Sequence, residues 1–274
     1  MLRRAFPAMG TEVELLLDVH PSAESELALA RAEREFERLE ANLSRFRPDS
    51  ELSALNRAGA IDAGDDLLAV TRLAVEARER TGGRFDPTVH DALVSAGYDR
   101  TFAEVRAGGP AGPPQRCGGE VRIDGHRIEV EPGFRLDLGG IAKGYAVERA
   151  AATLRLAGPA LVNAGGDIAA HGRLWPVGVE TGDGQITLGL EDCALATSGR
   201  DRRRWRRNGT EAHHLIDPET GSPAKSEYLR VTVTAPTAVE AEVLAKAVFL
   251  GAEPGGPAVL VTTDGRTVLT GGLV

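Results

Sequence analysis

Residues 137–149 read DLGGIAKGYAVER and join an apolar, strand-like approach to a helix that we expect to continue to about Leu156. Gly139 and Gly140 would let the backbone come close to a ligand, and a helix start offers unpaired N–H groups to a phosphate. Lys143 would add a positive charge at the same place. The residues also fit an ordinary turn whose lysine faces water, so this stretch alone leaves both interpretations open.

A second glycine pair follows a short expected strand, in the run NAGGD at residues 163–167. Gly165 and Gly166 would allow the backbone to approach a phosphate or a ribose, although a tight turn alone would also explain them. A similar corner, Ser198 followed by glycine, ends a later strand.

Length and charge limit the class of protein. The 274 residues can bury a sizeable core, as one large domain or as two interleaved lobes, and no low-complexity linker divides the chain. A net charge of −8 argues against generic nucleic-acid binding, which requires a basic field. The run RRRWRR at residues 202–207 departs from this charge. We expect a solvated loop there, and a contact with an acidic partner or a nucleic acid is the alternative.

Cysteine usage and the N-terminal residues bear on the compartment. Cys117 and Cys193 are far apart and make neither a disulfide framework nor a metal motif. The opening MLRRAFPAMGTEVEL lacks the apolar region of a signal peptide, and no stretch approaches the roughly 20 apolar residues that cross a bilayer. We therefore expect no membrane segment and a cytoplasmic location.

Hydrophobic periodicity outlines the other elements. Residues 12–19 alternate as a strand with the odd-numbered positions from Val13 to Val19 on one face, and residues 22–43 form a long charged helix. The expected apolar face of that helix consists of Leu27, Ala30, Phe36, Leu39 and Leu43. Further elements are expected at 50–56, 65–80 and 237–250 as helices, at 121–130 as a hairpin, and at 160–162, 176–180, 185–190, 193–197, 230–235, 258–262 and 267–269 as strands.

Several loops carry side chains that could touch a planar ligand. Met9 precedes Gly10 just before the first expected strand, and it could cover a ring or merely cap the core. Phe46 lies at the entrance of a turn and could stack on a ring or plug the core. In RFDPT at residues 84–88, Asp86 could accept hydrogen bonds from a heterocycle or from nearby backbone N–H groups.

Two adjacent histidines, His213 and His214, precede the run LIDPETGSP. Neighbouring residues of a strand point to opposite faces, so at most one of them faces a given site. His214 is close to Asp217 in sequence and is a candidate base or phosphate-side donor. A structural histidine near a turn is the alternative.

Taken in order, eight segments closely resemble the ApbE family, the FAD:protein FMN transferases. They are MGT, SRFRPDSELSALN, GGRFDPT, DLGGIAKGYAVE, LVNAGGDI, TSG, HHLIDPETGSP and the helix that contains TAVEAE. The resemblance extends from Met9 to the C-terminal hairpin, and this many ordered motifs are a specific signal. It implies an α+β fold in which two lobes of mainly antiparallel sheet, with flanking helices, enclose FAD in the cleft between them.

The resemblance also implies the residues that contact FAD. The matching positions are Met9, Phe46 (usually Tyr in the family), Arg84, Phe85, Asp86, Asp137, Lys143 and Ile216, to which we add Gly165, Gly166, Ser198 and His214.

The implied reaction transfers FMN to a protein. A Thr or Ser hydroxyl of an acceptor protein attacks the flavin-side phosphorus of FAD, and the products are protein-bound FMN and AMP. His214 matches the family's histidine near the pyrophosphate, so His214 and Lys143 are the expected catalytic residues. Phosphoryl transfer depends on positioning and charge neutralisation, which suits glycine corners with a lysine.

The sequence departs from the family at its expected Mg²⁺ site. The resemblance implies Ala-Asp on the last helix with Thr four residues later, and a backbone carbonyl that here belongs to Gly140. The Asp position is Glu242 and the Thr position is Lys246, whose ammonium has no lone pair for a metal. Either Lys246 takes the metal's place, or it turns away and Gly140 with Glu242 still holds a weakened Mg²⁺.

Other functions stay open at this level. One is an FAD-binding protein that has lost transfer activity or transfers without metal. Another is a pyrophosphatase that cleaves FAD to FMN and AMP with water as the nucleophile. A flavin oxidoreductase is disfavoured, because the sequence shows no nicotinamide motif.

Overall fold

The computed structural model describes residues 1–106, 108–110, 112–207 and 209–273. Its helices are α1 (Ala23–Leu43), α2 (Glu51–Ala58), α3 (Asp65–Arg80), α4 (His90–Ser95), α5 (Ala142–Arg155) and α6 (Ala238–Phe249), with a 3₁₀ turn at Phe102–Glu104.

Eight strands form a single large sheet in the order β1-β2-β6-β7-β10-β15-β16-β17. They are β1 (Leu2–Ala8), β2 (Thr11–Leu17), β6 (Ala160–Ala164), β7 (Asp167–His171), β10 (Cys193–Gly199), β15 (Tyr228–Ala235), β16 (Ala258–Thr262) and β17 (Thr267–Thr270). Each neighbouring pair is antiparallel.

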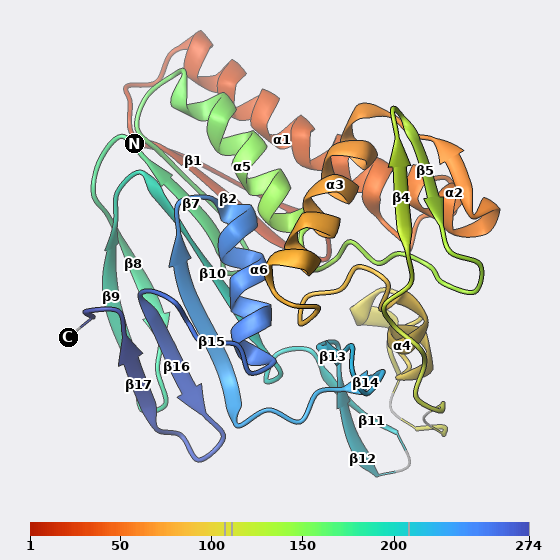
Figure 1. Ribbon diagram of the computed structural model, residues 1–274. Helices are drawn as coiled ribbons and strands as arrows, with labels where there is room; N and C mark the ends of the chain where they lie inside the picture. Colours follow the sequence, from red (N-terminus) through yellow and green to blue (C-terminus); the bar gives the residue numbers. More distant parts are fainter. Residues whose placement is uncertain (107, 111, 208, 274) are drawn as a thin grey trace.

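The sheet carries different layers on its two faces. Helices α1, α5 and α6 cover one face (Figure 1), where Val13, Leu15 and Leu17 of β2 are fully buried, as their alternation predicts. The hairpin of β8 (Trp175–Glu180) and β9 (Gln185–Leu190) packs on the other face through a separate apolar cluster. The order of layers is therefore helices, sheet, hairpin.

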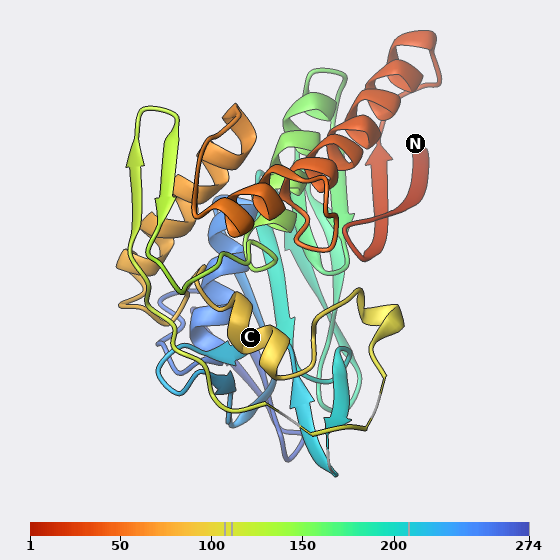
Figure 2. The same ribbon diagram turned by 90° about the vertical axis from the view of Figure 1, so that its right-hand side faces the viewer.

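A smaller lobe lies beside this layered lobe. Strands β3 (Ala60–Asp62), β5 (Arg127–Val130) and β4 (Val121–Asp124) form a three-stranded antiparallel sheet, and Figure 2 shows its β4–β5 hairpin apart from the large sheet. The expected α+β fold, with antiparallel sheets and flanking helices, is confirmed.

A third apolar cluster, built around Tyr98 and Trp205, joins α4 to the hairpins at the far end of the molecule. These hairpins are β11 (Arg204–Arg207) with β12 (Thr210–His213) and β13 (Ile216–Asp217) with β14 (Ser222–Pro223).

Helix α1 shows how local sequence fixes an element. The Ser22 hydroxyl accepts a hydrogen bond from Ser25 N at 3.2 Å, and the Ser25 hydroxyl accepts one from Ser22 N at 2.9 Å, which satisfies the helix start. The predicted apolar face of α1 is correct at Phe36, Leu39 and Leu43, which are buried. It is wrong at Leu27, which is 46% exposed, because the buried stripe passes through Leu29.

The elements that were not expected from the sequence include β1, β7 and α4. Strand β1 was not predicted because Pro7 and two arginines interrupt its apolar pattern. Pro is tolerated there because β1 is an edge strand. The segment before Leu136 is not a strand. The backbone of Leu136 instead pairs with the Asn56 side chain: Leu136 N donates to Asn56 Oδ1 at 2.7 Å, and Leu136 O accepts from Asn56 Nδ2 at 2.8 Å.

The arginine-rich run at 202–207 is not a solvated loop. It enters β11, where Trp205 is 6% exposed and its indole N–H donates to Ala96 O at 2.8 Å. The alternation of arginines with a buried aromatic follows from the two-residue period of a strand.

Within the described part of the chain, no helix combines the length and the apolar character that a membrane span needs.

Candidate active site

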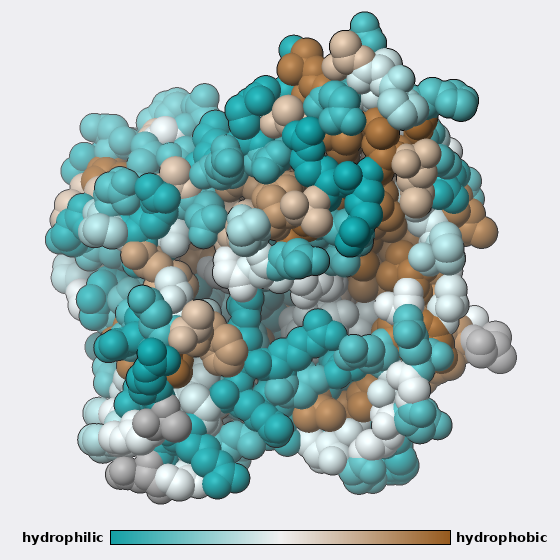
Figure 3. Space-filling model, turned by 180° about the vertical axis from the view of Figure 1, so that it is seen from behind, coloured by the Kyte–Doolittle hydropathy of each residue, from teal (hydrophilic) through white to brown (hydrophobic). Residues whose placement is uncertain are grey.

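A cavity of about 450 Å³ is lined by segments that lie far apart in the chain. Its walls come from the β1–β2 turn, the end of α1 with the turn and helix α2 that follow it, and residues 84–102, which include α4. The stretch 137–143, Arg203, the segment that follows β12, and α6 complete them. Seen from behind, the molecular surface is largely hydrophilic and is hollowed near its middle (Figure 3). The cavity volume falls within the range of about 300–1,000 Å³ typical of small-molecule sites.

Phe46 and Tyr98 form an aromatic wall of the cavity. Their ring centroids are 5.5 Å apart, and the Arg45 guanidinium carbon lies 4.1 Å from the Phe46 centroid and 4.8 Å from the Tyr98 centroid. Phe46 therefore lines the cavity and also packs on its neighbours, so both of its expected roles stay open.

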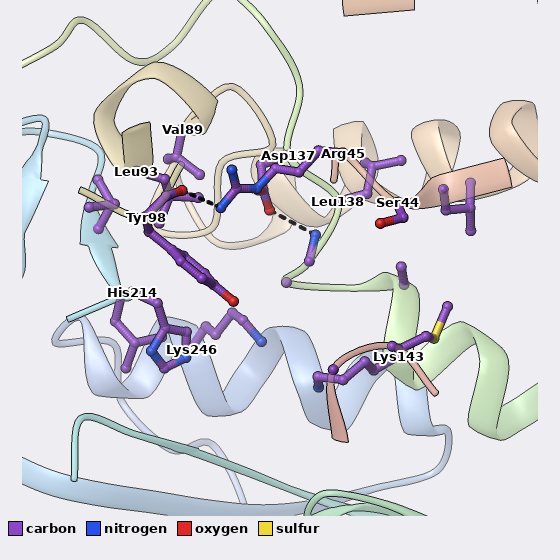
Figure 4. A pocket seen from close by; sticks show the side chains of 18 of the residues that line it. Ser44, Arg45, Val89, Leu93, Tyr98, Asp137, Leu138, Lys143, His214 and Lys246 are labelled. Atoms are coloured by element: carbon purple, nitrogen blue, oxygen red, sulfur yellow. Dashed lines mark hydrogen bonds and ion pairs between the residues drawn. The ribbon is translucent and has the colours of Figure 1, made fainter. Parts of the chain in front are cut away.

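Arg45 is held in place by Asp137, the first residue of the stretch 137–149. Its guanidinium pairs with the Asp137 carboxylate and donates to Tyr98 O at 2.7 Å (Figure 4), and both charged side chains are at most 9% exposed. The other Asp137 oxygen accepts from Gly139 N at 2.8 Å. Asp137 lines the cavity as expected, and its observed contacts hold the glycine corner and Arg45.

Four charged residues, Lys143, Asp167, Glu242 and Lys246, form a cluster at one side of the cavity, here called the ammonium cluster. Lys143 Nζ contacts the Asp167 carboxylate and lies 2.9 Å from Glu242 Oε1, which is also 3.2 Å from Lys246 Nζ. Glu242 Oε2 accepts from Gly144 N at 2.8 Å. One N–H at the start of α5 is thus used inside the protein and is not available to a phosphate.

Burial and charge compete in the ammonium cluster. Burial alone would lower the pKa of Lys143, but the carboxylates of Asp167 and Glu242 outweigh it, so the pKa is raised. Burial would raise the pKa of Glu242, yet the two ammonium groups and the Gly144 N–H hold that pKa well below its usual value. Burial is the largest effect on Asp167 and raises its pKa in spite of Lys143.

The two adjacent histidines have separate environments. His213 Nε2 lies 3.0 Å from Ala224 O and His213 Nδ1 accepts from Leu215 N at 3.3 Å, so His213 is part of the protein core. His214 lines the cavity, and its Nδ1 is buried without a hydrogen-bond partner among the described residues. Burial lowers the pKa of His214 well below 6.5, and the charges of Arg203 and Lys246 lower it further. His214 is therefore neutral at pH 7.

The remaining expected contacts also line the cavity: Met9, Arg84, Phe85, Asp86, Gly140 and Ile216. Met9 adopts a left-handed φ of 51° in the β1–β2 turn, followed by Gly10 at 70°. Asp86 Oδ1 accepts hydrogen bonds from both Thr88 N and the Thr88 hydroxyl at 2.7 Å. Of the two roles expected for Asp86, this oxygen therefore fills the structural one, as an acceptor for groups of its own turn.

Gly165, Gly166 and Ser198 lie outside the lining of the cavity. Gly165 has a φ of 65°, and a Cβ there would come within 2.3 Å of the Thr11 hydroxyl oxygen, so close packing explains this glycine. Gly166 N donates to Asn163 Oδ1 at 3.0 Å within the same β6–β7 turn. The expectation that this turn approaches a ligand is thus not supported by the geometry. The turn instead leads into Asp167 of the ammonium cluster.

The residues at the expected Mg²⁺ site do not fit a divalent cation. Both oxygens of Glu242 already accept from N–H groups, and two ammonium groups lie within 3.2 Å of Oε1. The aliphatic stem of Lys246 packs on Gly140, where an added Cβ would be 3.1 Å from Lys246 Cε. Among the described residues, no group of three or more His, Cys, Asp or Glu side chains could hold a metal ion. Mg²⁺ prefers a near-octahedral set of oxygen ligands, which this arrangement does not provide.

Sequence reasoning missed Arg45, Tyr98, Asp167 and Arg203 as site residues. Arg203 lines the cavity and donates to Gly10 O at 3.2 Å. The carboxylate directly after the glycine pair was the available signal for Asp167. Arg45 carries no comparable signal, because its partner Asp137 is distant in sequence.

These features define a two-lobed α+β protein with a cavity that combines aromatic walls, two ammonium groups and a neutral histidine. A family model described as the ApbE family matches residues 9–269, and the chain belongs to this family.

The relatives agree with this assignment. The FAD:protein FMN transferase of Treponema pallidum is 32% identical over 93% of this chain and 82% of its own length, and that of Haemophilus influenzae is 28% identical over 88% and 78%. The flavin transferase ApbE from Vibrio cholerae superposes with a TM-score of 0.79 at 26% identity, covering 98% of this chain and 96% of that chain. An ApbE protein from Thermotoga maritima shares the fold with a TM-score of 0.84 at 24% identity, covering 98% and 96%.

Proposed function

We propose that the protein is an FAD:protein FMN transferase that attaches FMN to a Thr or Ser hydroxyl of an acceptor protein. Membership of the ApbE family and the names of its relatives support this proposal. The observation that carries it is that Phe46, Lys143, His214 and Lys246 line the same cavity. An aromatic wall suits a planar ring, and ammonium groups suit the two negative charges of a diphosphate.

The proposed reaction forms one bond and breaks one. The acceptor oxygen bonds to the FMN-side phosphorus of FAD, and the bond from that phosphorus to the bridging oxygen breaks, so AMP leaves with the bridging oxygen. The hydroxyl proton passes to His214, which is neutral and can accept it. The lysines keep their protons and stabilise charge on the phosphate oxygens.

The aromatic and backbone groups hold the substrate in this proposal. Phe46 and Tyr98 stack on a ring, Met9 and Ile216 cover it, and Asp137 keeps Arg45 in place behind the rings. Such positioning is a large part of catalysis in phosphoryl transfer.

The test uses an extract of source cells from which the gene for this protein has been deleted. After incubation with the purified protein and FAD, denaturing gel electrophoresis should show a fluorescent flavin band, and AMP should be released in equal amount. AMP release without any fluorescent band would indicate hydrolysis by water and would overturn the transferase proposal. Omission of FAD is the control.

A further inference from the structure

The ammonium cluster contains as many cationic as anionic side chains, but only the cationic ones line the cavity. Lys143 and Lys246 line the cavity and their side chains are 16% exposed, whereas Asp167 and Glu242 are at most 2% exposed and lie outside the lining. Figure 4 shows the two lysines reaching the same space from α5 and α6. The cluster therefore presents its cationic side to a ligand and keeps its anionic side in the core.

Glu242 sets the position of both ammonium groups. Its Oε1 binds both lysines, at 2.9 Å and 3.2 Å, and its Oε2 is held by Gly144 N. Three hydrogen bonds thus hold this carboxylate, and the two ammonium groups beside Oε1 would repel a divalent cation there.

Lys246 is the less engaged of the two lysines. Lys143 contacts two buried carboxylates, while the one ion pair of Lys246 within the described residues is with Glu242. An ammonium has three N–H donors, so Lys246 keeps two for a ligand. Its stem lies close to Gly140, where an added Cβ would be 3.1 Å from Lys246 Cε.

We propose that Lys246 takes the place of a divalent metal beside the diphosphate of FAD, and that this protein therefore binds FAD and transfers FMN without one. The proposal rests on the transferase function proposed above. Lys246 donates hydrogen bonds to the non-bridging phosphate oxygens and remains protonated throughout. The bond changes and the transfer of the hydroxyl proton to His214 are unchanged.

The first test is an FAD titration followed by the change in flavin fluorescence, in excess EDTA and in excess Mg²⁺. The wild-type dissociation constant should be the same in both conditions. Lys246→Met should weaken binding about tenfold or more in both, because a charge-assisted hydrogen bond is lost. Lys246→Arg should retain metal-independent binding. The matched control is Lys225→Met, an exposed lysine outside the cavity lining, which should bind like the wild type.

Wild-type binding that tightens about tenfold or more with Mg²⁺ would overturn the inference. So would Lys246→Met that binds FAD as well as the wild type. Circular dichroism of each variant separates loss of binding from loss of fold, and Lys246→Arg keeps the test valid if Lys246→Met does not fold.

The second test repeats the gel assay of FMN transfer in EDTA. Transfer should persist. Loss of transfer in EDTA, restored by Mg²⁺, would overturn the inference but leave the transferase proposal standing. Failure of the wild type to bind FAD in either condition would instead overturn the transferase proposal itself.

Discussion

Lys143 Nζ lies 2.9 Å from Glu242 Oε1, although 99 positions separate the two residues in the chain. The contact ties the first turn of α5 to the middle of α6 at the edge of the cavity. Gly144 makes it possible, because an added Cβ there would be only 2.6 Å from Ala238 O. Stability and the position of the cavity's positive charges thus depend on the same contact.

Glu242→Gln should destabilise the protein strongly. Removing one partner from a buried ion pair leaves uncompensated charge and typically costs about 3–5 kcal/mol. The free energy of unfolding from urea denaturation measures it. Glu240→Gln, on the same helix, is the control, because its ion pair with Arg80 at 3.4 Å is exposed and should be worth less than about 1 kcal/mol. Equal effects of the two substitutions would contradict this account of the ammonium cluster.

Gly144→Ala should also destabilise, by about 1–3 kcal/mol, because the new methyl group would force α5 away from α6. Gly184→Ala is the matched control: a Cβ there meets nothing within 4 Å. Thermal unfolding of the two variants provides the comparison. An unchanged melting temperature for Gly144→Ala would show that the helices need not be this close.

Phe46→Ala should weaken FAD binding by about 1–3 kcal/mol, the usual worth of stacking between an aromatic side chain and a base. Fluorescence titration with FAD measures it, and Phe46→Tyr should bind normally. Phe134→Ala, whose ring lies outside the cavity lining, controls for the loss of an aromatic side chain. If Phe46→Ala retains full affinity, Phe46 serves only to pack against Tyr98.

His214→Ala should lower the rate of FMN transfer by about 10²–10⁴-fold while FAD still binds, because the proton acceptor is lost. The lowered pKa of His214 keeps the ring neutral, so the wild-type rate should stay constant as the pH falls through 6.5. The exposed His20 supplies the control, since His20→Ala should transfer normally. A rate that halves near pH 6.5 would mean that another group accepts the proton.

The lowered pKa of His214 also affects stability. Below pH 6.5 His214 becomes protonated in the unfolded chain but not in the folded protein. The contribution of His214 to the free energy of unfolding is therefore complete above that pH and declines below it.

The sequence predicted much of the fold because its periodic segments are long. Helix α3 has the predicted bounds, and the alternation in β2 places its buried face correctly. Strand β1 and helix α4 were missed, since Pro7 breaks one pattern and α4 spans only six residues. Short elements depend on tertiary contacts that a local pattern does not contain.

The contacts of the candidate site were likewise predictable only in part from the sequence. Glu242 and Lys246 pair at 3.2 Å, which is the contact that a spacing of four residues on one helix favours. The pairings of Lys143 with Asp167 and of Arg45 with Asp137 join distant segments, so no spacing rule could predict them.

The most direct test of the account is a crystal structure of the protein with FAD and Mn²⁺, whose anomalous scattering locates the metal. We expect a diphosphate oxygen within about 3.2 Å of Lys246 Nζ, as in a hydrogen bond, and no anomalous peak beside Glu242. A Mn²⁺ ion bound between Glu242 and the diphosphate, with Lys246 displaced, would contradict it.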